Sequence, residues 1–521
     1  MSDNTPLETL AASRLKLPSE GVKAVYIERR AIDARRKSNI TFVYTLHVDT
    51  ALPETRVLSK LRGDKDINSV EIIPAEPVIP GTRPLASPPV IVGAGPAGLL
   101  AALTLAQHGY KPLLLEQGRD VDRRTADVLS FWETGNLNPT SNVQFGEGGA
   151  GTFSDGKLTT RVTDPRMQQV LDVLVAAGAP REIKYRHKPH VGTDLLRQVV
   201  KNIRNRIIAL GGTVRFEAAV TDIMVQDNRI TAITVNNEQH IPVEVLILAI
   251  GNSARPTYEM LHRRGIALEA KPFAIGVRIE HPQELIDQAQ YGDLAGHPAL
   301  GAADYALVYH DKLKSRTAYS FCMCPGGQVV AAASEIGGVV TNGMSLHARA
   351  SGTANSALVV NVNPVDCGSH PLDTIAFQRR WEQLAFATGG KSYYAPVQTV
   401  GDFLAGRRSS SAFATPPTYS PGVQAADLRD CLPSFVTDTI AQALPDFGRK
   451  IKGFDSSGAV LTGVETRTSA PVRLVRDENL VSHGTAGLYP IGEGAGYAGG
   501  IMSAALDGLK AALEVIKIYK P

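Results

Sequence analysis

The chain has 521 residues, of which 43% are hydrophobic and 20% charged, with a formal net charge of +3. Because this length exceeds what one compact core holds, we expect about two to four domains of an ordinary globular protein. The nearly balanced charge argues against membrane and nucleic-acid partners, and four cysteines are too few for a disulfide scaffold. The first residues show no signal peptide and no stretch suits a membrane span, so we expect a cytoplasmic protein.

Residues 1–85 predict a small N-terminal α/β domain of ferredoxin-like type, followed by a Pro-rich linker. Residues 24–27 and 39–48 have strand character, and a third strand is expected at 69–74. The intervening segment predicts a short basic helix carrying Arg29, Arg30, Arg35, Arg36 and Lys37. Such a helix could bind anions or RNA, but no aromatic residues are interleaved for base stacking. We therefore favour a solvated face and do not expect a nucleic-acid partner.

Residues 90–118 carry the clearest motif, a strand, a glycine turn, a helix and a second strand. Gly93 permits the tight turn, Gly95 lets the backbone approach a pyrophosphate, and Gly98 lets helix and strand pack closely. The helix N-terminus offers free N–H groups to phosphates. Glu116, at the end of the second strand, is placed to accept hydrogen bonds from a ribose. The unit predicts a dinucleotide site that by itself fits NAD or FAD.

The next segment is basic and then rich in glycine. Arg123 and Arg124 follow the ribose position closely enough to reach phosphates or ribose hydroxyls. Residues 141–161 contain a literal GxGxxG, but no apolar strand precedes it, so we reject a second dinucleotide fingerprint. Its glycines instead predict backbone lying against a flat or extended ligand, with Asp155 and Lys157 as polar groups; a surface turn is the alternative.

Residues 271–454 show no α/β alternation and predict a mixed α+β substrate or cap domain. Cys322 and Cys324 are spaced CxC, which in a strand places both thiols on one face. There they could exchange with a disulfide or a flavin, although two buried small side chains are the favoured interpretation. No second pair of ligands has a suitable spacing, so we expect no metal site.

Residues 487–512 form a short strand, a glycine loop and a helix of small residues. They also contain a literal GxGxxG, but no strand and ribose acid follow. We interpret this segment as the second half of an FAD site, in which Glu493 after Gly492 would bind the ribitol. The helix beginning near Gly500 would direct its N–H groups at the flavin, and a helix that only packs on the sheet is the alternative. The apolar strand at 243–250 returns the chain to the nucleotide sheet, and Gly251 at its end either approaches the cofactor or makes an ordinary turn.

The FAD-binding domain is thus expected in two parts, 86–270 and 455–521, with the cap at 271–454 inserted between them. Asp155, Lys157 and Cys324 are the candidate catalytic residues, because a carbon or nitrogen substrate needs a proton donor or acceptor. The expected cofactor-binding residues are Gly93, Gly95, Pro96, Ala97, Gly98, Glu116, Gln117, Arg124, Gly149, Gly151, Thr152, Val220, Gly251, Gly492, Glu493, Gly500, Ile501 and Met502.

The paired motifs GAGPAG…LLLEQG and GLYPIGEGAGYAGGIMSAALDG resemble the glutathione-reductase-like FAD superfamily, particularly its geranylgeranyl reductases and p-hydroxybenzoate-hydroxylase-type enzymes. More narrowly, about residues 27–510 are similar to bacterial and plastid FAD-dependent dehydrogenases of unassigned substrate. The segments that carry this similarity are NVQFGEGGAGTFSDGKL, AYSFCMCPGGQVVAAASE and NSALVVNV. The resemblance implies non-covalent FAD, a Rossmann-like α/β domain, an inserted mixed α+β cap and a small N-terminal α/β domain. Glu493 departs from the Asp usual in the superfamily.

We predict hydride transfer between flavin N5 and an unidentified small organic substrate held against the cap. Because only one dinucleotide unit has its full context, no stable NAD(P)H domain is expected. Electrons would come from transiently bound NAD(P)H, from ferredoxin or another carrier protein, or from the substrate itself. A flavin monooxygenase of the hydroxylase type and an RNA-modifying or RNA-binding flavoprotein are the alternatives.

Overall fold

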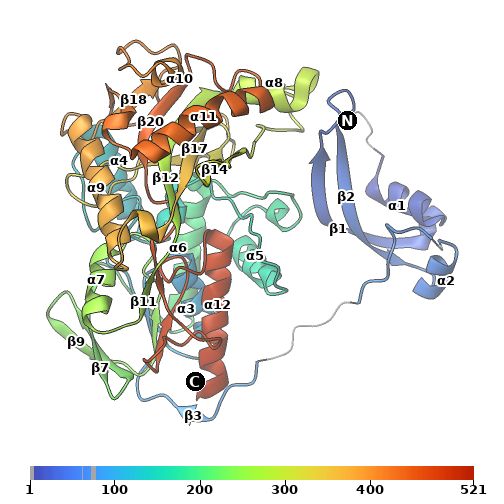
Figure 1. Cartoon of the computed structure of the whole chain (residues 1–521). Coiled ribbons are helices and arrows are strands. Elements are labelled where there is room, and N and C mark those ends of the chain that lie inside the picture. Colours follow the sequence, from blue (N-terminus) through green and yellow to red (C-terminus); the bar gives the residue numbers. More distant parts are fainter. Residues whose placement is uncertain (1–4, 62, 72–77) are drawn as a thin grey trace.

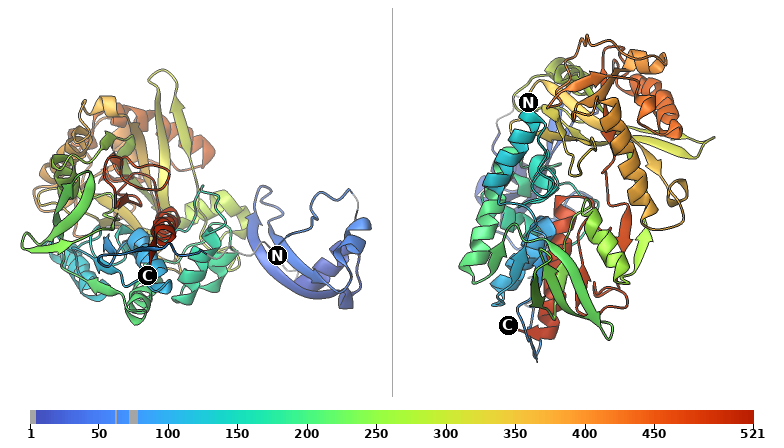
Figure 2. Two further views of the ribbon diagram at one scale, coloured as in Figure 1. Left: turned by 90° about the horizontal axis from the view of Figure 1, so that it is seen from below. Right: turned by 90° about the vertical axis from the view of Figure 1, so that its left-hand side faces the viewer.

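The computed structural model describes residues 5–61, 63–71 and 78–521. A main body of two packed sheets with helices around them carries a smaller N-terminal region at its side (Figure 1). The two views of Figure 2 show the main body as two lobes, one formed by residues 78–270 together with the red C-terminal segment and the other by the yellow and orange part between them. The architecture is the predicted mixed α/β fold with an inserted cap.

The first lobe is built on a five-stranded parallel sheet in the order β22-β10-β4-β5-β6. Its strands are β4 (Val90–Val92), β5 (Leu113–Leu115), β6 (Thr213–Arg215), β10 (Leu246–Leu248) and β22 (Leu488–Pro490). Most of their side chains are buried, as expected of a parallel sheet covered on both faces. Strand β22 comes from the far end of the sequence, so the chain returns to this sheet after the cap.

Helices α3 (Pro96–Gln107) and α12 (Ile501–Ile518) pack side by side in this lobe. A Cβ on Gly508 would lie 1.9 Å from the carbonyl oxygen of Ala97, so only glycine permits this approach. The other elements of the lobe surround this pair and the sheet. They are α4 (Val121–Thr134), α5 (Met167–Ala176), α6 (Thr193–Ala209), α7 (Arg255–Arg263), β7 (Val220–Gln226), β8 (Arg229–Val235), β9 (Gln239–Pro242), β11 (Leu268–Ala270), β21 (Val472–Leu474), β3 (Arg83–Pro84) and β23 (Tyr519–Lys520).

The cap is built on a seven-stranded sheet in the order β13-β14-β17-β12-β20-β18-β19, antiparallel except for the last pair. Its strands are β12 (Phe273–Pro282), β13 (Val308–Asp311), β14 (Arg316–Cys324), β17 (Thr353–Val362), β18 (Ala395–Thr399), β19 (Val423–Ala425) and β20 (Val460–Glu465). The hairpin β15 (Gly327–Ala331) and β16 (Thr341–Ser345) and the helices α8 (Gln283–Tyr291), α9 (Asp373–Thr388), α10 (Val400–Leu404) and α11 (Ser434–Lys450) complete it. Short 3-10 helices occur in all parts of the described chain, at Ser19–Gly21, Ala150–Phe153, Arg181–Lys184, Gly292–Leu294, Pro364–Asp366 and Leu428–Asp430.

The expected cap boundary at residue 454 is too early. Strand β20 pairs with β12 and β18 and is buried along its whole length, so it belongs to the cap sheet. The sequence prediction failed here because a short buried strand carries no mark of the sheet that it joins.

The N-terminal region consists of α1 (Leu7–Leu15), β1 (Val22–Asp33), β2 (Thr41–Thr50) and α2 (Glu54–Ser59). The prediction of a basic helix between the strands is wrong, because β1 continues to Asp33. Within β1, Arg29 pairs with Thr45 of β2, and Arg30 pairs with Tyr44. The described part of this region has a two-stranded sheet instead of the larger ferredoxin-like one. Residues 69–71 are not a strand, and the rest of the expected third strand lies outside the described residues.

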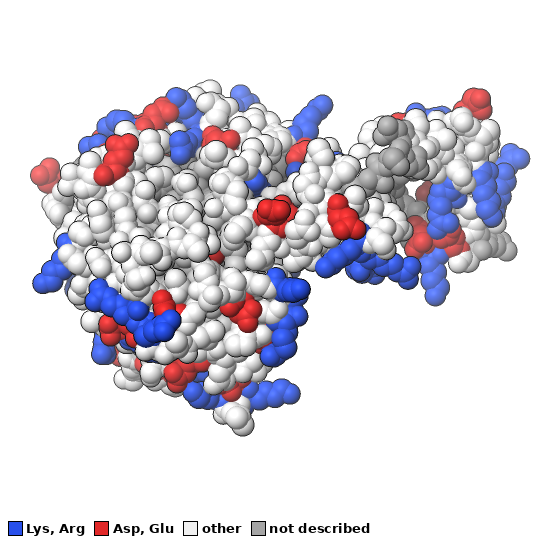
Figure 3. Space-filling model, turned by 90° about the horizontal axis from the view of Figure 1, so that it is seen from above, with Lys and Arg blue, Asp and Glu red and all other residues white. Residues whose placement is uncertain are grey.

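Three residues of the predicted basic cluster have partners within the chain. The Arg29 guanidinium lies 3.0 Å from Nδ1 of His187, Arg30 stacks over the ring of Phe42, and Arg35 pairs with Asp33. The backbone of Arg30 also exchanges two hydrogen bonds of 2.7 Å with Tyr185 and His187 of the main body. Seen from above in Figure 3, basic side chains predominate on the N-terminal region, whereas basic and acidic ones alternate over the main body. Among the described residues, no helix is long and apolar enough to cross a membrane.

Candidate functional site

A cavity of about 390 Å³ lies where the two lobes meet. Residues that directly follow β4, β5, β10 and β22 line one side of it, at the carboxyl ends of the parallel strands. This is the edge at which doubly wound sheets bind their ligands. The opposite side comes from the cap, through β14, β16 and the segment after β20.

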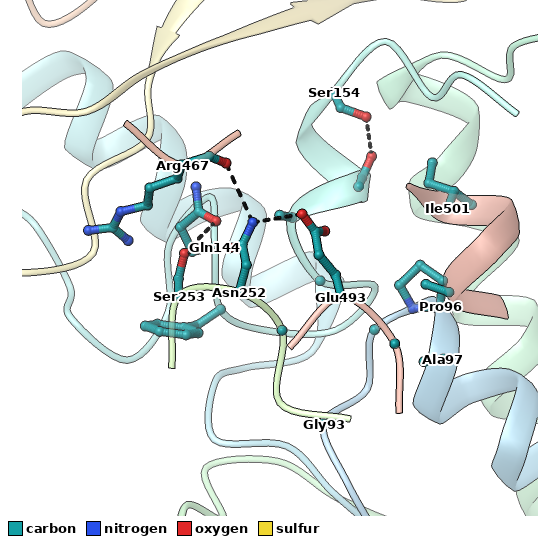
Figure 4. Close-up of a pocket in the computed structure, with 18 of the residues that line it drawn as sticks. Gly93, Pro96, Ala97, Gln144, Ser154, Asn252, Ser253, Arg467, Glu493 and Ile501 are labelled. Carbon is teal, nitrogen blue, oxygen red and sulfur yellow. Dashed lines mark hydrogen bonds between the residues drawn. The ribbon is translucent and has the colours of Figure 1, made fainter. Parts of the chain in front are cut away.

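Most of the predicted cofactor-binding residues line this cavity. Figure 4 shows Gly93, Pro96 and Ala97 beside Glu493 and Ile501, from opposite ends of the chain. The predicted residues that line the cavity are Gly93, Gly95, Pro96, Ala97, Glu116, Gln117, Gly149, Gly151, Val220, Gly251, Gly492, Glu493, Gly500 and Ile501. Gly98, Arg124, Thr152 and Met502 do not line it.

The glycines of the site have two distinct roles. A Cβ on Gly93 would lie 2.3 Å from the carbonyl oxygen of Ala249, and one on Gly98 would lie 1.8 Å from that of Gly93, so these two let backbone segments pack. A Cβ on Gly251, Gly499 or Gly500 would meet nothing within 4 Å, although all three line the cavity. These three glycines therefore leave space for a ligand that lies against the backbone.

Glu116 is buried and holds the first motif together. Its carboxylate accepts hydrogen bonds from the amides of Ala94 (2.8 Å), Gly118 (2.9 Å) and Gly146 (3.0 Å). A carboxylate offers about four lone-pair positions, so about one remains for a ligand. Glu116 thus positions the glycine turn and the glycine-rich loop, and its contact with a ribose stays a prediction.

Arg124 does not reach the cavity, contrary to its predicted contact with phosphates or ribose. It is fully buried, and its guanidinium donates to the carbonyl oxygens of Asn142 (2.8 Å), Val143 (3.0 Å) and Glu147 (2.6 Å). Burial lowers the pKa of Arg124 to about 10. Arg124 therefore fixes the shape of the glycine-rich loop, a role for which a single arginine on a helix gives no sequence signal.

Thr152 and Met502 also face away from the cavity. Thr152 is buried and accepts a hydrogen bond from the Thr193 hydroxyl through its backbone oxygen (2.6 Å). Met502 points into the hydrophobic core of the first lobe. Helix periodicity explains the second case, because Met502 follows Ile501 by about 100° around α12.

Glu493 lines the cavity on the side of the first lobe. Its Oε1 accepts a hydrogen bond of 2.9 Å from the Asn252 amide, and burial raises the pKa of Glu493 to about 7. The Ser253 hydroxyl, 2.8 Å from Oδ1 of Asn252, also lies 3.0 Å from Oε1 of Gln144 (Figure 4). Sequence reasoning missed these three neighbours, although Asn252 and Ser253 directly follow the predicted strand-end glycine.

Two of the three candidate catalytic residues line the cavity. Asp155 is buried, 2.7 Å from the ammonium of Lys157 and 2.9 Å from Nε of Arg349. Burial would raise the pKa of Asp155, but the two cations outweigh it and lower the pKa. Burial likewise opposes the charge on Lys157, yet Asp155 and nearby thiols leave its pKa raised. The pair is therefore an ammonium and a carboxylate at neutral pH.

Cys324 does not line the cavity, and Cys322 does. The prediction that both thiols share one face is wrong, because β14 has a bulge between Phe321 and Cys324. Cys322 there has φ +44°, which breaks the alternation of the strand. Among the described residues, no group of three or more His, Cys, Asp and Glu side chains could hold a metal ion.

Comparison with known proteins identifies the cofactor. Residues 272–468 match the family described as FAD-dependent protein, C-terminal domain-like, and residues 91–125 match an NAD(P)-binding Rossmann-like domain. An uncharacterized protein of Clostridium beijerinckii is 52% identical over 518 residues, which cover 99% of this chain and 97% of the relative. The chain belongs to a family of FAD-dependent proteins. FAD is therefore the cofactor of this flavoprotein, as predicted.

More distant proteins are similar to this flavoprotein over part of its length or at low identity. The digeranylgeranylglycerophospholipid reductase of Haloferax volcanii is 27% identical over 228 residues, 42% of this chain and 50% of that protein. A geranylgeranyl bacteriochlorophyll reductase-like structure from Thermoplasma acidophilum covers 83% of this chain and 79% of its own, with 13% identity and a TM-score of 0.36. CtdE in complex with FAD covers 83% and 84%, with 13% identity and a TM-score of 0.33. Residues 1–49 match a domain of unknown function.

Proposed function

We propose that this flavoprotein is a dehydrogenase or reductase that moves a hydride between flavin N5 and a small organic substrate. The observation that carries the proposal is that one cavity is lined on one side by the glycine-rich segments of the first lobe and on the other by polar side chains of the cap. A substrate bound on the cap side would therefore lie directly against the cofactor.

The residues of the first lobe fit FAD. The open space beside Gly251, Gly499 and Gly500 suits a flat ring system, and the N-terminus of α12 borders the same space. Unpaired N–H groups at a helix N-terminus favour negative charge on a nearby ligand. Bound FAD supplies a hydride acceptor or donor at flavin N5. The chain's own contribution is to hold the cofactor, to exclude water and to orient the substrate.

The cap supplies the polar groups for the substrate. Thr341 and Asn342 come from β16, and Glu465 and Arg467 from the end of β20 and just beyond it. Burial raises the pKa of Glu465 despite the nearby Arg278, so this carboxyl is a candidate to hold a proton. Lys157, the ammonium on the opposite loop, would stabilise a negative charge that forms on the substrate. Glu465 thus joins Asp155, Lys157 and Cys324, the residues predicted from the sequence, as a candidate for proton transfer.

Flavin absorbance under anaerobic conditions tests the proposal. The FAD-loaded protein is mixed with NADH, NADPH or reduced ferredoxin, and the donor that bleaches the flavin is identified. Fractionated metabolites are then added without oxygen, and we expect at least one fraction to restore the oxidised spectrum. If only oxygen restores it, with uptake stimulated by an aromatic compound, the protein is a hydroxylase-type monooxygenase.

A further inference from the structure

Two cysteines of the cap lie near the cavity and differ in their exposure to it. Cys322 lines the cavity, whereas Cys324 is fully buried behind it. The Cys324 thiol donates a hydrogen bond of 3.3 Å to the carbonyl oxygen of Cys322, so the chain curls back on itself between them. Cys322 has φ +44°, in the left-handed region that favours glycine. Such strained residues concentrate at functional sites, because the surrounding structure must hold them in place.

Cations from both lobes converge on this pair. The ammonium of Lys157, on the glycine-rich loop, donates to the carbonyl oxygen of Met323, between the two cysteines. Nη1 of Arg278 donates to the carbonyl oxygen of Cys322 at 2.9 Å. Asp155 pairs with both Lys157 and Arg349, and Glu465 pairs with Arg278, so three cations face two carboxylates around the cysteines. The environment therefore favours a negative charge at the cavity end of the pair.

The two thiols differ accordingly in acidity. The hydrogen bond with the Cys324 thiol lowers the pKa of Cys322 against the opposing effect of burial, and the charges of Lys157 and Arg278 lower it further. The hydrogen bond with Cys322 and burial raise the pKa of Cys324 well above its usual value. A thiolate facing the cavity with a protonated thiol behind it is the arrangement of an attacking and a resolving cysteine.

We propose that Cys322 and Cys324 form a redox pair that exchanges two electrons with the bound FAD. Oxidation joins the two Sγ atoms in a disulfide and releases two electrons together with the proton of Cys324. These add up to the hydride that oxidised FAD accepts, and the reverse step returns them and breaks the S–S bond. The proposal rests on the redox function proposed above and adds a second electron store beside the cofactor.

Counting electrons tests the pair. FAD-loaded protein, first oxidised with ferricyanide and freed of it, is titrated with dithionite without oxygen while the flavin spectrum is followed. We expect the wild type to take up about four electrons per FAD, two for the flavin and two for the disulfide. Cys322→Ser and Cys324→Ser should take up about two. Cys367→Ser is the matched control and should keep the wild-type count, because its thiol lies outside the cavity.

Mass spectrometry of the apoprotein gives a second readout that does not depend on activity. After oxidation and alkylation, the peptide with both cysteines should be two hydrogens lighter and unalkylated. Flavin content and circular dichroism show which variants fold, and Cys322→Ala replaces Cys322→Ser if the latter does not. A wild-type uptake of two electrons with both thiols alkylated would overturn the pair. Because dithionite replaces the natural donor, this outcome is independent of whether any donor or substrate supports hydride transfer.

Discussion

Arg255 and Glu382 form a two-pronged ion pair across the lobes, with Nη2 2.7 Å from Oε1 and Nη1 2.8 Å from Oε2. Each side chain is only 1% exposed. Arg255 begins α7, just after cofactor strand β10, and Glu382 lies on α9 of the cap. Arg467, which lines the cavity, donates to the same carboxylate at 3.0 Å. One buried carboxylate thus ties the wall of the site to both lobes.

Removal of the Glu382 carboxylate should lower the stability of the folded protein. Glu382→Ala leaves two buried guanidinium groups without their main partner, so we expect the free energy of unfolding to fall by about 3–5 kcal/mol. Urea denaturation measures it, and Arg379→Ala, on the partly exposed edge of the same network, should cost about 1 kcal/mol or less. A loss below that of the Arg379 variant would contradict the role of Glu382.

The same pair predicts how stability depends on pH. Burial opposes the charge on Glu382, but Arg255 and Arg467 outweigh it and lower its pKa. Because the folded pKa lies below the unfolded one, the stabilisation is present above about pH 4 and is lost as the pH falls further. In the Glu382→Gln variant this part of the acid-induced loss should disappear.

Loss of the Arg124 side chain should weaken FAD binding, although we expect Arg124 to make no contact with FAD. Arg124→Met leaves several buried carbonyl oxygens of residues 142–147 without a donor, and the affinity for FAD should fall at least about tenfold. Titration of the apoprotein with FAD, followed by flavin fluorescence, measures the affinity. Arg123→Met is the matched control, since its guanidinium pairs with Asp120 and Glu217 near the surface. Equal affinities of the two variants would refute the assignment.

Gly500 offers a direct test of the ligand space. Its backbone is extended, with φ 174°, and a Cβ there would meet no atom within 4 Å. Gly500→Ala should therefore leave the stability of the apoprotein within about 0.5 kcal/mol of the wild type but weaken FAD binding, because the methyl group enters the cavity. Gly458→Ala, whose Cβ would make an ordinary contact of 3.5 Å, should change neither quantity. Unchanged FAD affinity in Gly500→Ala would place the cofactor elsewhere.

The raised pKa of Glu493 predicts that the apoprotein loses stability as the pH rises, the opposite of the effect of Glu382. Its pKa is raised from 4.5 to about 7 by burial, so the folded state favours the neutral form. Its contribution to stability is complete below about pH 4.5 and is lost as the pH rises through 7. Glu493→Gln should thus be about 2 kcal/mol more stable than the wild type at pH 8 and equal to it at pH 4. Thermal unfolding at both pH values checks this, with Glu478→Gln at the surface as the control.

The sequence predicted well which residues of the first lobe line the cavity, because that lining depends on local rules. A glycine turn after a strand and an acid at the end of the next strand place Gly93 and Glu116 at one sheet edge whatever else the chain does. The C-terminal loop with Glu493 was recognised from the same kind of pattern. Each of these residues lies within a few positions of the strand that carries it.

The cap side could not be predicted, because it depends on long-range packing. Thr341, Asn342 and Arg467 follow no motif and reach the cavity only through the pairing of cap strands. The bulge that turns Cys322 toward the cavity and Cys324 away from it is likewise invisible in a CxC spacing. For Arg124 the sequence predicted a contact that the structure does not show. This basic residue near the motif binds carbonyl oxygens of the glycine-rich loop and does not line the cavity.

The packing of α12 against α3, with β22 at the edge of the parallel sheet, has a consequence for biosynthesis. The first glycine motif leaves the ribosome early, but its partner strand and helix are made from residues 488–518. Until that segment emerges, Glu493 and the N-terminus of α12 are missing from the cavity and β10 has an open edge. The complete wall of the cavity can therefore form only after residues 488–518 have been synthesised.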